Sequence, residues 1–338
     1  MAKGFVLIVS SKPDPHVDKV VKYLRAWSIP FYKLETNNLI KSPDIRFSKI
    51  NKTSHYSIFD KELEISLSDI RSVWFRKPYF GYDMINNELK VQQALSERYK
   101  IDEFRQVCNT LLIKAEENGI FVVSPYNALN KAKYKILQLD KAFNIGLSIP
   151  DTLVSTRYDE IEKFCSDHDG QMIIKVLGKP EVTYGKKSIT FQTYLVSIDK
   201  FREYYKKREV DYPFLVQEKI EKSLELRITI IGNQIFPCAI YSQENKNAKL
   251  DWTKANPFDI PHKEYKLPKD IIKKCFNLCK HFKLQFGAID MAVTPEGKYV
   301  FFEINPNGQY LWIEHLTKLP LSEAMSNLLV YPERYALK

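Results

Sequence analysis

The sequence predicts a mixed α/β (α+β) protein built from two or three packed subdomains. At 338 residues the chain is too long for one small hydrophobic core. It opens with a strand, a helix and a second strand, the βαβ order that is typical of a parallel or mixed sheet covered by helices. Its last third contains longer strands joined by short turns, which favours an antiparallel sheet.

The first unit is expected over residues 1–122 as an N-terminal α/β domain. No glycine-rich turn follows its first strand, so the dinucleotide-binding fingerprint is absent. Its last helix is long and ends before Gly119, a residue suited to a helix C-terminus. The predicted elements run strand, helix, strand, hairpin, strand and helix: 5–9, 17–27, 30–34, roughly 45–67, 72–75 and about 87–117.

Two further units follow, a central lid over 123–213 and a C-terminal antiparallel-sheet subdomain over 214–338. In the lid, a helix at 133–144 carries apolar residues at Ile136, Leu139 and Phe143 and stops at Gly146. The other elements predicted for the lid are strands at 152–154, 172–177 and near 188–195 and a helix at about 199–208. Those of the last unit are strands at 214–219, 224–231, 235–241, 288–293 and 299–304, with a helix at about 269–282.

The composition is that of a folded globular protein. Apolar residues make up 44% of the chain and aromatic residues 13%, which argues against disorder. No apolar run reaches the roughly 18–20 residues that span a membrane and no signal-peptide pattern is present, so a cytoplasmic protein without a membrane partner is expected. The net charge of +10 is spread among acidic residues along the whole chain, so it does not by itself indicate nucleic acid.

The five cysteines are odd in number and irregularly spaced. Cys275 and Cys279 lie one helical turn apart with His281 nearby, a pattern that a metal site would also give. No second pair of ligands accompanies them, which favours reduced cysteines that pack in the core.

The strongest chemical pattern is the set Asp290, Glu303 and Asn305. The turn at 294–297 predicts that the flanking strands form an antiparallel hairpin, which brings Asp290 close to Glu303. Strand alternation then places Glu303 and Asn305 on one face and Phe302 on the other. Clustered oxygen ligands favour Mg²⁺, which also binds substrate phosphates. The alternative is a polar sheet face that is directed to solvent.

Lys175 stands in an otherwise apolar strand, where an ammonium group needs an anionic partner. A nucleotide phosphate would serve, and so would a structural glutamate. Glu225 and Arg227 share one face of a later strand, which Glu218 precedes. A carboxylate suits ribose hydroxyls and a guanidinium suits phosphate oxygens, whereas an ion pair between neighbouring side chains is the structural alternative.

Together these residues resemble the ATP-grasp superfamily in order and spacing over about 130–310. The pattern comprises Lys135 at the start of a helix that ends in Gly146-x-x-x-Pro150, then Lys175, Gln217-Glu218-Lys219-Ile220, Glu225, Asp290 and Glu303-x-Asn305. The resemblance implies an ATP-grasp fold in which Lys135 and Lys175 bind ATP phosphates, the segment from Gln217 and Glu218 through Lys219 to Ile220 forms the adenine hinge, Glu225 holds the ribose, and Asp290, Glu303 and Asn305 bind Mg²⁺.

A closer resemblance covers almost the whole chain. Val73-Trp-Phe-Arg-Lys-Pro78, Leu224-Glu-Leu-Arg-Ile-Thr229, Ser242-Gln243 with Asp251-Trp252, and Glu303-Ile-Asn-Pro-Asn-Gly-Gln309 with Trp312-Ile-Glu314 look like the graspetide, or microviridin-type, peptide maturases. The resemblance implies that Arg227 contacts the γ-phosphate or an acyl phosphate. Arg76 is a candidate for an active-site or a structural role, and a solvated arginine at the end of a strand is the alternative. Thr253 and Lys254 follow Asp251-Trp252 where the family often has arginine, a departure in a loop associated with substrate binding.

The resemblance implies an ATP-dependent macrocyclising ligase. Such an enzyme phosphorylates Asp or Glu side chains of a ribosomal precursor peptide and joins them to Ser or Thr as esters, or to Lys as amides. ATP and Mg²⁺ are the implied cofactors, and a leader peptide followed by an acidic core is the implied partner. The charged helix near 199–211 is a candidate surface for the leader, and a homodimer is also expected.

Two rival interpretations remain open at the level of sequence. The first is an ATP-grasp ligase that joins a carboxylate and an amine on an amino acid or another small substrate. The second is a basic nucleic-acid-binding protein without catalysis, for which salt-sensitive binding would be unaffected by alanine at Asp290 or Glu303. It is disfavoured because it leaves the lysine in the apolar strand and the acidic cluster unexplained.

Overall fold

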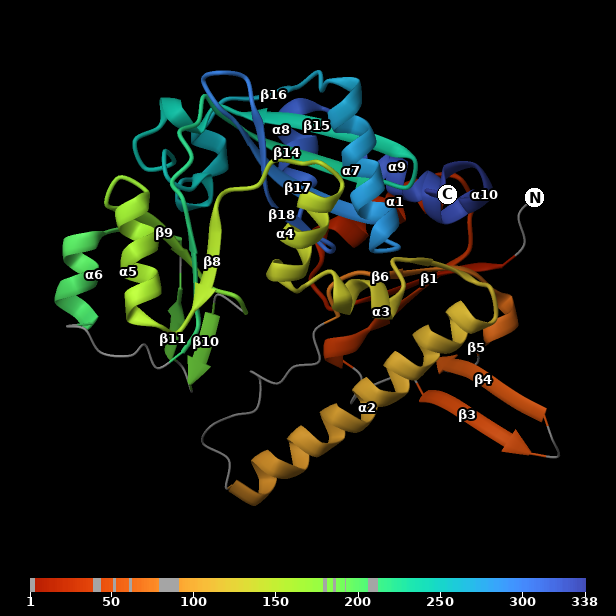
Figure 1. The fold of residues 1–338 in the computed structure, drawn as a ribbon. Coiled ribbons are helices and arrows are strands. Elements are labelled where there is room, and N and C mark those ends of the chain that lie inside the picture. The colour runs from red at the N-terminus through yellow and green to blue at the C-terminus, as the bar shows by residue number, and fades with distance from the viewer. Residues whose placement is uncertain are drawn as a thin grey trace.

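The computed structural model describes residues 4–38, 44–50, 53–60, 63–78, 91–178, 181–184, 187–191, 193–205 and 212–338 (Figure 1). The first four residues predicted for the long helix, 87–90, and the last three predicted for the lid helix, 206–208, lie outside this range. Among the described residues, no helix is both long enough and apolar enough to cross a membrane.

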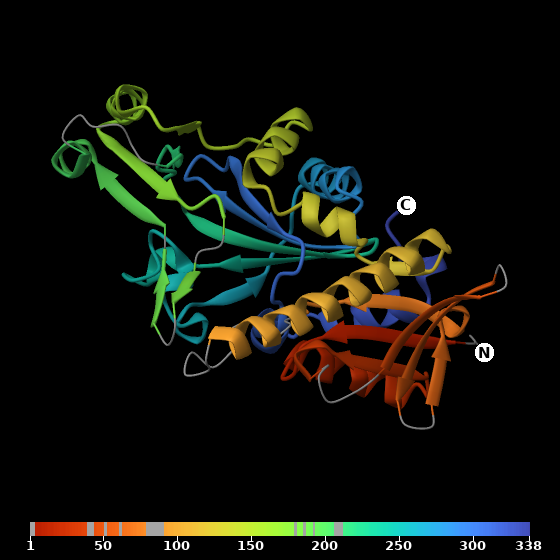
Figure 2. The same cartoon turned by 90° about the horizontal axis from the view of Figure 1, so that it is seen from below.

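The N-terminal unit is built on a four-stranded parallel sheet. Its strands lie in the order β2-β1-β6-β7, with α1 (Pro15–Ala26) in the connection between β1 and β2. A separate antiparallel sheet, β3-β4-β5, lies beside the long helix α2 (Val91–Glu117), as Figures 1 and 2 both show. The strands are β1 (Phe5–Ser10), β2 (Phe31–Glu35), β3 (Asp44–Ile50), β4 (Thr53–Asp60), β5 (Leu63–Ser66), β6 (Ile70–Phe75) and β7 (Phe121–Val123).

The central lid is a four-stranded antiparallel sheet in the order β12-β9-β13-β8, with α5 and α6 packed on it. A short hairpin of β10 and β11 extends from it (Figure 1). The elements are β8 (Thr152–Ser155), α5 (Tyr158–Asp167), β9 (Gln171–Lys175), β10 (Glu181–Tyr184), β11 (Lys187–Thr190), β12 (Tyr194–Ser197), α6 (Ile198–Tyr205) and β13 (Phe214–Gln217).

The C-terminal unit is a five-stranded antiparallel sheet in the order β16-β15-β14-β17-β18. Helices α4 and α7 pack on it in one core, and α8 and α9 pack on it in a second core. The elements are α3 (Tyr126–Lys131), α4 (Lys135–Asn144), β14 (Leu224–Ile231), β15 (Gln234–Ile240), β16 (His262–Glu264), α7 (Lys269–His281), β17 (Phe286–Val293), β18 (Tyr299–Asn305), α8 (Leu311–Thr317), α9 (Leu321–Val330) and α10 (Pro332–Tyr335). Helix α4 was expected in the lid, but it packs on the C-terminal sheet.

The second core joins the N-terminal and C-terminal units into one packed body. Apolar residues of α1 and β1 share it with those of α9 and the start of β17. Hydrogen bonds reinforce the junction, because the Ser72 hydroxyl and the Arg71 guanidinium donate to the carbonyls of Leu329 and Val330. The N-terminal α/β unit therefore depends on the C-terminal helices for part of its buried surface.

Three predictions of local structure need correction. Helix α5 was not predicted, although Tyr158, Ile161 and Cys165 have helical spacing and are buried. The single strand expected near 188–195 is two strands, β11 and β12. Phe214–Gln217 pairs with β8 and β9 in the lid sheet, four residues beyond the limit suggested for the lid at 213.

The apolar face predicted for helix α4 is also wrong. Leu139 is buried, but Ile136 and Phe143 are 52% and 66% exposed. The helix instead buries Gln138, whose side-chain amide donates to the carbonyl of Ile304 and accepts from its N–H. The helix thus buries a polar side chain that satisfies the backbone groups of a strand, where the hydrophobic pattern predicted an apolar residue.

His16 links the first helix to the start of α8. The N–H groups of Tyr310 and Leu311 donate to its Nε2 at 3.1 and 3.3 Å, and its Nδ1 lies 3.2 Å from Asp14 Oδ1. Burial lowers the pKa of His16, and the hydrogen bond with Asp14 offsets this in part. The neutral ring is needed, because a proton on Nε2 would displace both backbone donors.

We expect the free energy of unfolding to decrease as the pH falls below about 6.5, the ordinary pKa of histidine. The unfolded chain then binds a proton at residue 16 that the folded chain does not, so acid favours unfolding. The melting temperature between pH 7.5 and 5.5 should fall less steeply in His16→Gln than in the wild type. His55→Gln, at an exposed position on β4, should keep the wild-type slope; equal slopes in all three proteins would refute the assignment.

Candidate functional site

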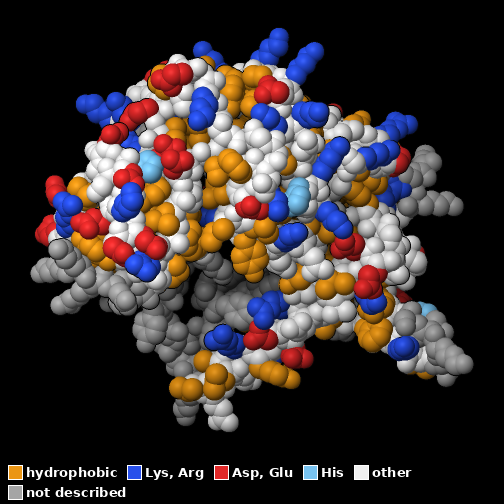
Figure 3. Space-filling model, viewed as in Figure 1, with side chains coloured by type: hydrophobic (Ala, Val, Ile, Leu, Met, Phe, Trp, Pro, Cys, Tyr) orange, Lys and Arg blue, Asp and Glu red, His pale blue; other side chains and the backbone are white. Residues whose placement is uncertain are grey.

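A cavity of about 520 Å³ lies between the lid sheet and the C-terminal sheet. On the face seen in Figure 3, a crevice separates the lid from the body of the molecule, and basic and acidic side chains are interspersed around it. Most of the residues singled out in the sequence line this cavity: Lys135, Lys175, Gln217, Glu218, Lys219, Ile220, Glu225, Asp290 and Glu303. Segments more than 160 residues apart in the chain thus supply one site.

Four charged side chains form a row at the sheet end of the cavity. Arg227 on β14 is paired with Asp290 on β17, and Asp290 is paired with Glu303 on β18, which confirms the predicted hairpin register. The Arg227 guanidinium donates to Asp290 Oδ2, and Lys135 Nζ lies 3.1 Å from Glu303 Oε2. The two acids therefore lie side by side, each with a cation on its outer side.

This pairing separates the protonation behaviour of the two acids. Burial raises the pKa of Asp290 to about 6, although Arg227 opposes the shift. Burial acts on Glu303 as well, but Lys135, Lys175 and Arg227 outweigh it and lower the pKa of Glu303. Asp290 Oδ1 is buried without a hydrogen-bond partner among the described residues. An unpartnered carboxylate oxygen beside a second carboxylate fits a divalent cation.

A β-bulge corrects the predicted orientation of Phe302. Asp290 pairs with Glu303 while Met291 pairs with Phe301, so Phe302 is the extra residue. Phe301 is fully buried in the core, whereas Phe302 lines the cavity next to Glu303. The prediction from strict alternation, which placed Phe302 on the core side, is wrong because the bulge adds one residue and shifts the alternation.

Lys175 extends from the lid toward this bulge. Its ammonium group lies 4.7 Å from the centroid of the Phe302 ring, in cation–π contact. Burial lowers its pKa to about 8, with partial compensation from Glu303. In the part of the chain that the structure describes, no carboxylate forms an ion pair with Lys175, so the structural glutamate considered for it is not found there. The cation is directed into the cavity and available to an anionic ligand.

Glu225 and Arg227 do not pair with each other, although they share a face of β14. Arg227 is engaged with Asp290, and Glu225 Oε1 accepts from Lys222 Nζ at 2.9 Å. Lys222 Nζ also donates to the carbonyl of Leu250 at 3.0 Å. Lys222 lines the cavity and was missed in the sequence, because a lysine in a polar loop has the pattern of a surface residue.

Arg227, Asn305 and Arg76 do not line the cavity. Asn305 Oδ1 accepts from the N–H of Asn307, within the turn that follows β18. Arg76 Nη1 donates to the carbonyls of Asn307 and Gly308 at 2.7 and 3.0 Å, and its side chain is almost fully buried. The burial of Arg76 contradicts the solvated arginine considered for this position, and its contacts favour a structural role in which it holds the turn that lies against Arg227.

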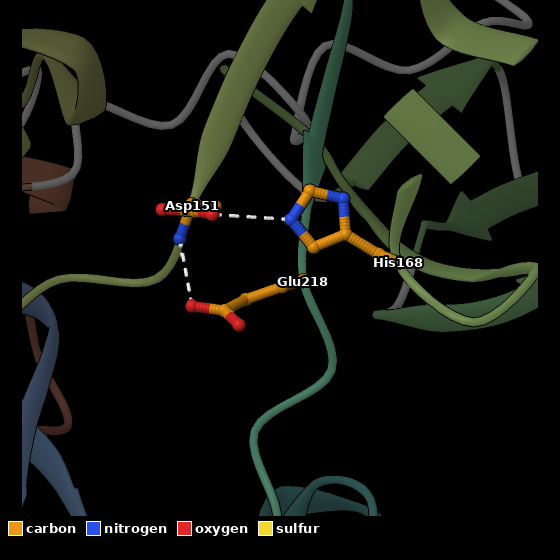
Figure 4. Close-up of side chains that lie close together, drawn as sticks. All are labelled: Asp151, His168 and Glu218. Atoms are coloured by element: carbon orange, nitrogen blue, oxygen red, sulfur yellow. Dashed lines mark hydrogen bonds and ion pairs between the residues drawn. The ribbon is translucent and has the colours of Figure 1, made fainter. Parts of the chain in front are cut away.

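A polar cluster joins the two strands that connect the lid to the body (Figure 4). The N–H of Asp151 donates to Glu218 Oε1 at 2.9 Å, and His168 Nε2 lies 3.2 Å from Asp151 Oδ2. Burial would lower the pKa of His168, but the Phe164 carbonyl and Asp151 outweigh it and raise the pKa. Both ring nitrogens face acceptors, so the doubly protonated ring fits the cluster, which ties α5 to the hinge.

The loop at 242–254 forms a second wall of the cavity. Asp251 caps the short 3₁₀ turn Trp252–Lys254 by accepting from the N–H of Thr253. Lys254 Nζ then donates to the carbonyl of Thr193 in the lid at 2.7 Å and lies 5.4 Å from the centroid of the Tyr194 ring. Lys254 therefore connects the C-terminal unit to the lid beside the cavity, which Thr193 and Thr253 line.

Comparison with known proteins gives no match to any protein-family model and no match among curated proteins. Among solved structures, an ATP-grasp ligase of Chryseobacterium gregarium associated with ribosomally synthesised peptides, in complex with ADP and a leader and core peptide, is 26% identical. The match covers 96% of this chain and 96% of that ligase, with a TM-score of 0.84. Macrocyclase MdnC of Microcystis aeruginosa, bound with precursor peptide MdnA, is 28% identical over 96% of this chain and 99% of its own, with a TM-score of 0.82.

More distant structures agree in fold. The ATP-grasp ligase PsnB, complexed with Mg, ADP and a variant of its minimal precursor, is 16% identical with a TM-score of 0.75. D-alanyl-alanine synthetase A of Vibrio cholerae is 12% identical with a TM-score of 0.55. The chain therefore has the ATP-grasp fold, and its architecture matches that of the ligases associated with ribosomal peptides, as its sequence suggested.

We expect Gly308→Ala to disturb the row of charges. A Cβ at this position would lie 2.5 Å from the Cβ of Ala288 and 3.4 Å from Arg227 Nη2. Overpacking of this kind typically costs about 1–3 kcal/mol. Urea denaturation should show the loss, whereas Gly178→Ala, where a Cβ meets open space, should change stability by less than about 0.5 kcal/mol. Equal stabilities of the two variants would contradict the expectation.

Proposed function

We propose that this chain, an ATP-dependent ligase with the ATP-grasp fold, macrocyclises a ribosomal precursor peptide by joining its acidic side chains to hydroxyl or amine side chains. The observation that carries the proposal is the shared cavity, which all the residues assigned to nucleotide binding line. Two similar ligases, each matching almost the whole chain, have a leader and core peptide or a precursor peptide bound. We expect the reaction in the cytoplasm, where ATP and newly made peptides meet.

The nucleotide would lie between the two sheets. Backbone groups at 218–220, in the strand-to-loop connection, would face the adenine, with Gln217 fixed beside them by a hydrogen bond to Thr152. Glu225 would accept from the ribose hydroxyls. Lys135 and Lys175 would approach the phosphates from opposite walls, where their positive charges neutralise the triphosphate.

Asp290 and Glu303 would hold Mg²⁺, with Asn305 as a further oxygen ligand from the end of the same strand. When bound, the cation supplies charge neutralisation at the β- and γ-phosphates. The unpartnered Oδ1 of Asp290 is the atom that fits this role. Arg227 holds the other oxygen of Asp290, so it fixes the orientation of the carboxylate.

In the first step, an oxygen of a peptide Asp or Glu carboxylate attacks the γ-phosphorus of ATP. The bond from this phosphorus to the bridging oxygen breaks, ADP leaves and an acyl phosphate forms. Lys135, Lys175 and Arg227 offset the repulsion between the two anions that must approach each other. In this role Arg227 acts near the transferred group, while Arg76 keeps the Asn307–Gly308 turn in place behind it.

In the second step, a Ser or Thr hydroxyl, or a Lys amine, of the same peptide attacks the acyl carbon. Phosphate leaves, the nucleophile loses its proton, and the net change is the loss of one water per ring. Both reacting groups belong to one bound peptide, so proximity replaces a bimolecular encounter. The protein supplies no nucleophile of its own in this scheme, and we expect esters ahead of amides.

The lid offers a surface for the remainder of the peptide. The side chains of Ile189, Phe191 and Tyr204, on or beside β11 and α6, are 63%, 42% and 79% exposed. Charged residues of α6, including Asp199 and Lys200, are exposed beside Tyr204. Exposed apolar side chains with charged neighbours are suited to a partner segment. We therefore place the leader of the precursor at α6 and the neighbouring strands.

Mass spectrometry of a candidate precursor, encoded next to this gene, after incubation with enzyme, ATP and Mg²⁺ tests the proposal. We expect one or more losses of water, and sensitivity to hydroxylamine where the new bond is an ester. In Glu303→Gln and Asp290→Asn the rate of ring formation should fall about a hundredfold or more, the order seen when a group that stabilises developing charge is removed.

Lys246→Gln, at an exposed site in the 242–254 loop, is the matched control and should keep the wild-type rate. ATP turnover stimulated by free amino acids, without any mass change of the peptide, would favour the small-substrate ligase instead. Salt-sensitive binding of nucleic acid that survives both acidic-site variants, without ATP turnover, would refute the enzyme assignment.

We expect Lys254→Met to uncouple ATP hydrolysis from ring formation. Loss of the hydrogen bond to Thr193 opens the mouth of the cavity and admits water to the acyl phosphate. Loss of a contact worth about 1 kcal/mol changes the ratio of open to closed molecules about fivefold. The amount of ADP formed per ring should rise by the same order. Lys246→Met serves as the control, and an unchanged ADP-to-ring ratio in Lys254→Met would contradict the role of Lys254.

A further inference from the structure

We infer that Lys222 is a positioning residue for the nucleotide. It holds the Glu225 carboxylate in place to accept hydrogen bonds from the ribose hydroxyls. The inference rests on the proposed nucleotide site and adds to it a residue outside the family pattern found in the sequence. Lys222 does not have to touch the nucleotide in this role. It acts through the carboxylate of Glu225.

The two side chains form the least exposed ion pair that the described part of the cavity contains. Lys222 Nζ lies 2.9 Å from Glu225 Oε1, and the side chains are 7% and 9% exposed. Lys222 enters from the loop between β13 and β14, and Glu225 is the second residue of β14. Because this loop follows the proposed adenine hinge, Lys222 links the segments that would face the base and the sugar.

Glu225 requires such a cation. Burial raises its pKa, and Lys222 and a hydrogen bond from Ser242 oppose the increase. A protonated carboxyl group has one fewer acceptor site and is a weaker acceptor than a carboxylate. Removal of Lys222 would leave a buried acid with Asp251 as a repulsive neighbour, so the group would take up a proton or move toward water.

Lys222 also fixes the wall that faces the sugar. Its ammonium group donates to the carbonyl of Leu250 at 3.0 Å, directly before Asp251 caps the turn at Trp252–Lys254. The same loop is tied at its base by Gln243, whose side-chain amide donates to the carbonyl of Lys249 at 3.1 Å. One lysine therefore sets the distance between Glu225 on the sheet and the loop opposite it. A ribose ring would enter between these two walls.

The alternative is a purely structural ion pair, whose loss would weaken the fold without regard to the sugar. The two roles make different predictions for a nucleotide that lacks the hydroxyls. A positioning role predicts a loss of affinity for ADP but little loss for 2′,3′-dideoxyADP. A structural role predicts that the affinities for both nucleotides decline together.

Calorimetric dissociation constants for the Mg²⁺ complexes of ADP and 2′,3′-dideoxyADP measure the difference. In the wild type we expect ADP to bind about tenfold or more tightly, since hydrogen bonds to a charged acceptor are among the stronger ones. The preference for ADP should fall toward one in Glu225→Gln and in Lys222→Met. It should be largely retained in Lys222→Arg, which keeps the positive charge and donors, and in the control Lys246→Met.

Lys222→Gln keeps a neutral donor for the Leu250 carbonyl and is measured beside Lys222→Met, so a folding defect in the latter does not decide the result. If Glu225→Gln loses the preference while both neutral Lys222 variants keep it, the inference is wrong and the nucleotide site stands. If Glu225→Gln also keeps the preference, the ribose role of Glu225 fails and the inference fails with it. If the wild type binds neither nucleotide, the proposed function itself is refuted.

Discussion

The site depends on the row of charges that crosses three neighbouring strands of the C-terminal sheet, the last of which is its edge strand. Arg227, Asp290 and Glu303 are register partners on β14, β17 and β18, and Lys135 closes the row from α4. Charges removed from water are costly unless they are paired, so the positions of the two cations follow from those of the two acids. The cations flank the acids rather than separate them, which leaves two carboxylates facing each other at the end of a cavity.

The packing around this row explains why distant parts of the chain are needed for it. Arg76 comes from the N-terminal sheet, yet it binds the carbonyls of the turn that follows β18 and lies against Arg227. His16 accepts from the first N–H groups of the next helix. The N-terminal unit therefore positions the segment that carries Glu303 and Asn305, through a shared core and a few buried polar contacts.

The lid, in contrast, reaches the body of the molecule through contacts that are compatible with motion. Lys175 contacts the Phe302 ring and Lys254 contacts a backbone carbonyl, and neither interaction is a buried ion pair. Such contacts are moderate in strength and would allow the lid to open and close. Strong pairs are found instead within the body, at Glu225 with Lys222 and at Asp290 with Arg227, where fixed geometry is useful.

The sequence by itself determined the hairpin that pairs Asp290 with Glu303 and many of the residues that line the cavity, because strand periodicity, turn residues and motif spacing are local. It did not predict the bulge that turns Phe302 into the cavity, the burial of Gln138 in place of Ile136, or the partners of Lys222 and Lys254. Each of these features depends on which backbone group or charged side chain lies opposite the residue in the folded protein. Only the tertiary structure decides this, because the position of a buried polar group depends on the partner with which it forms a hydrogen bond. The residues next to a loop lysine in the sequence do not reveal that partner.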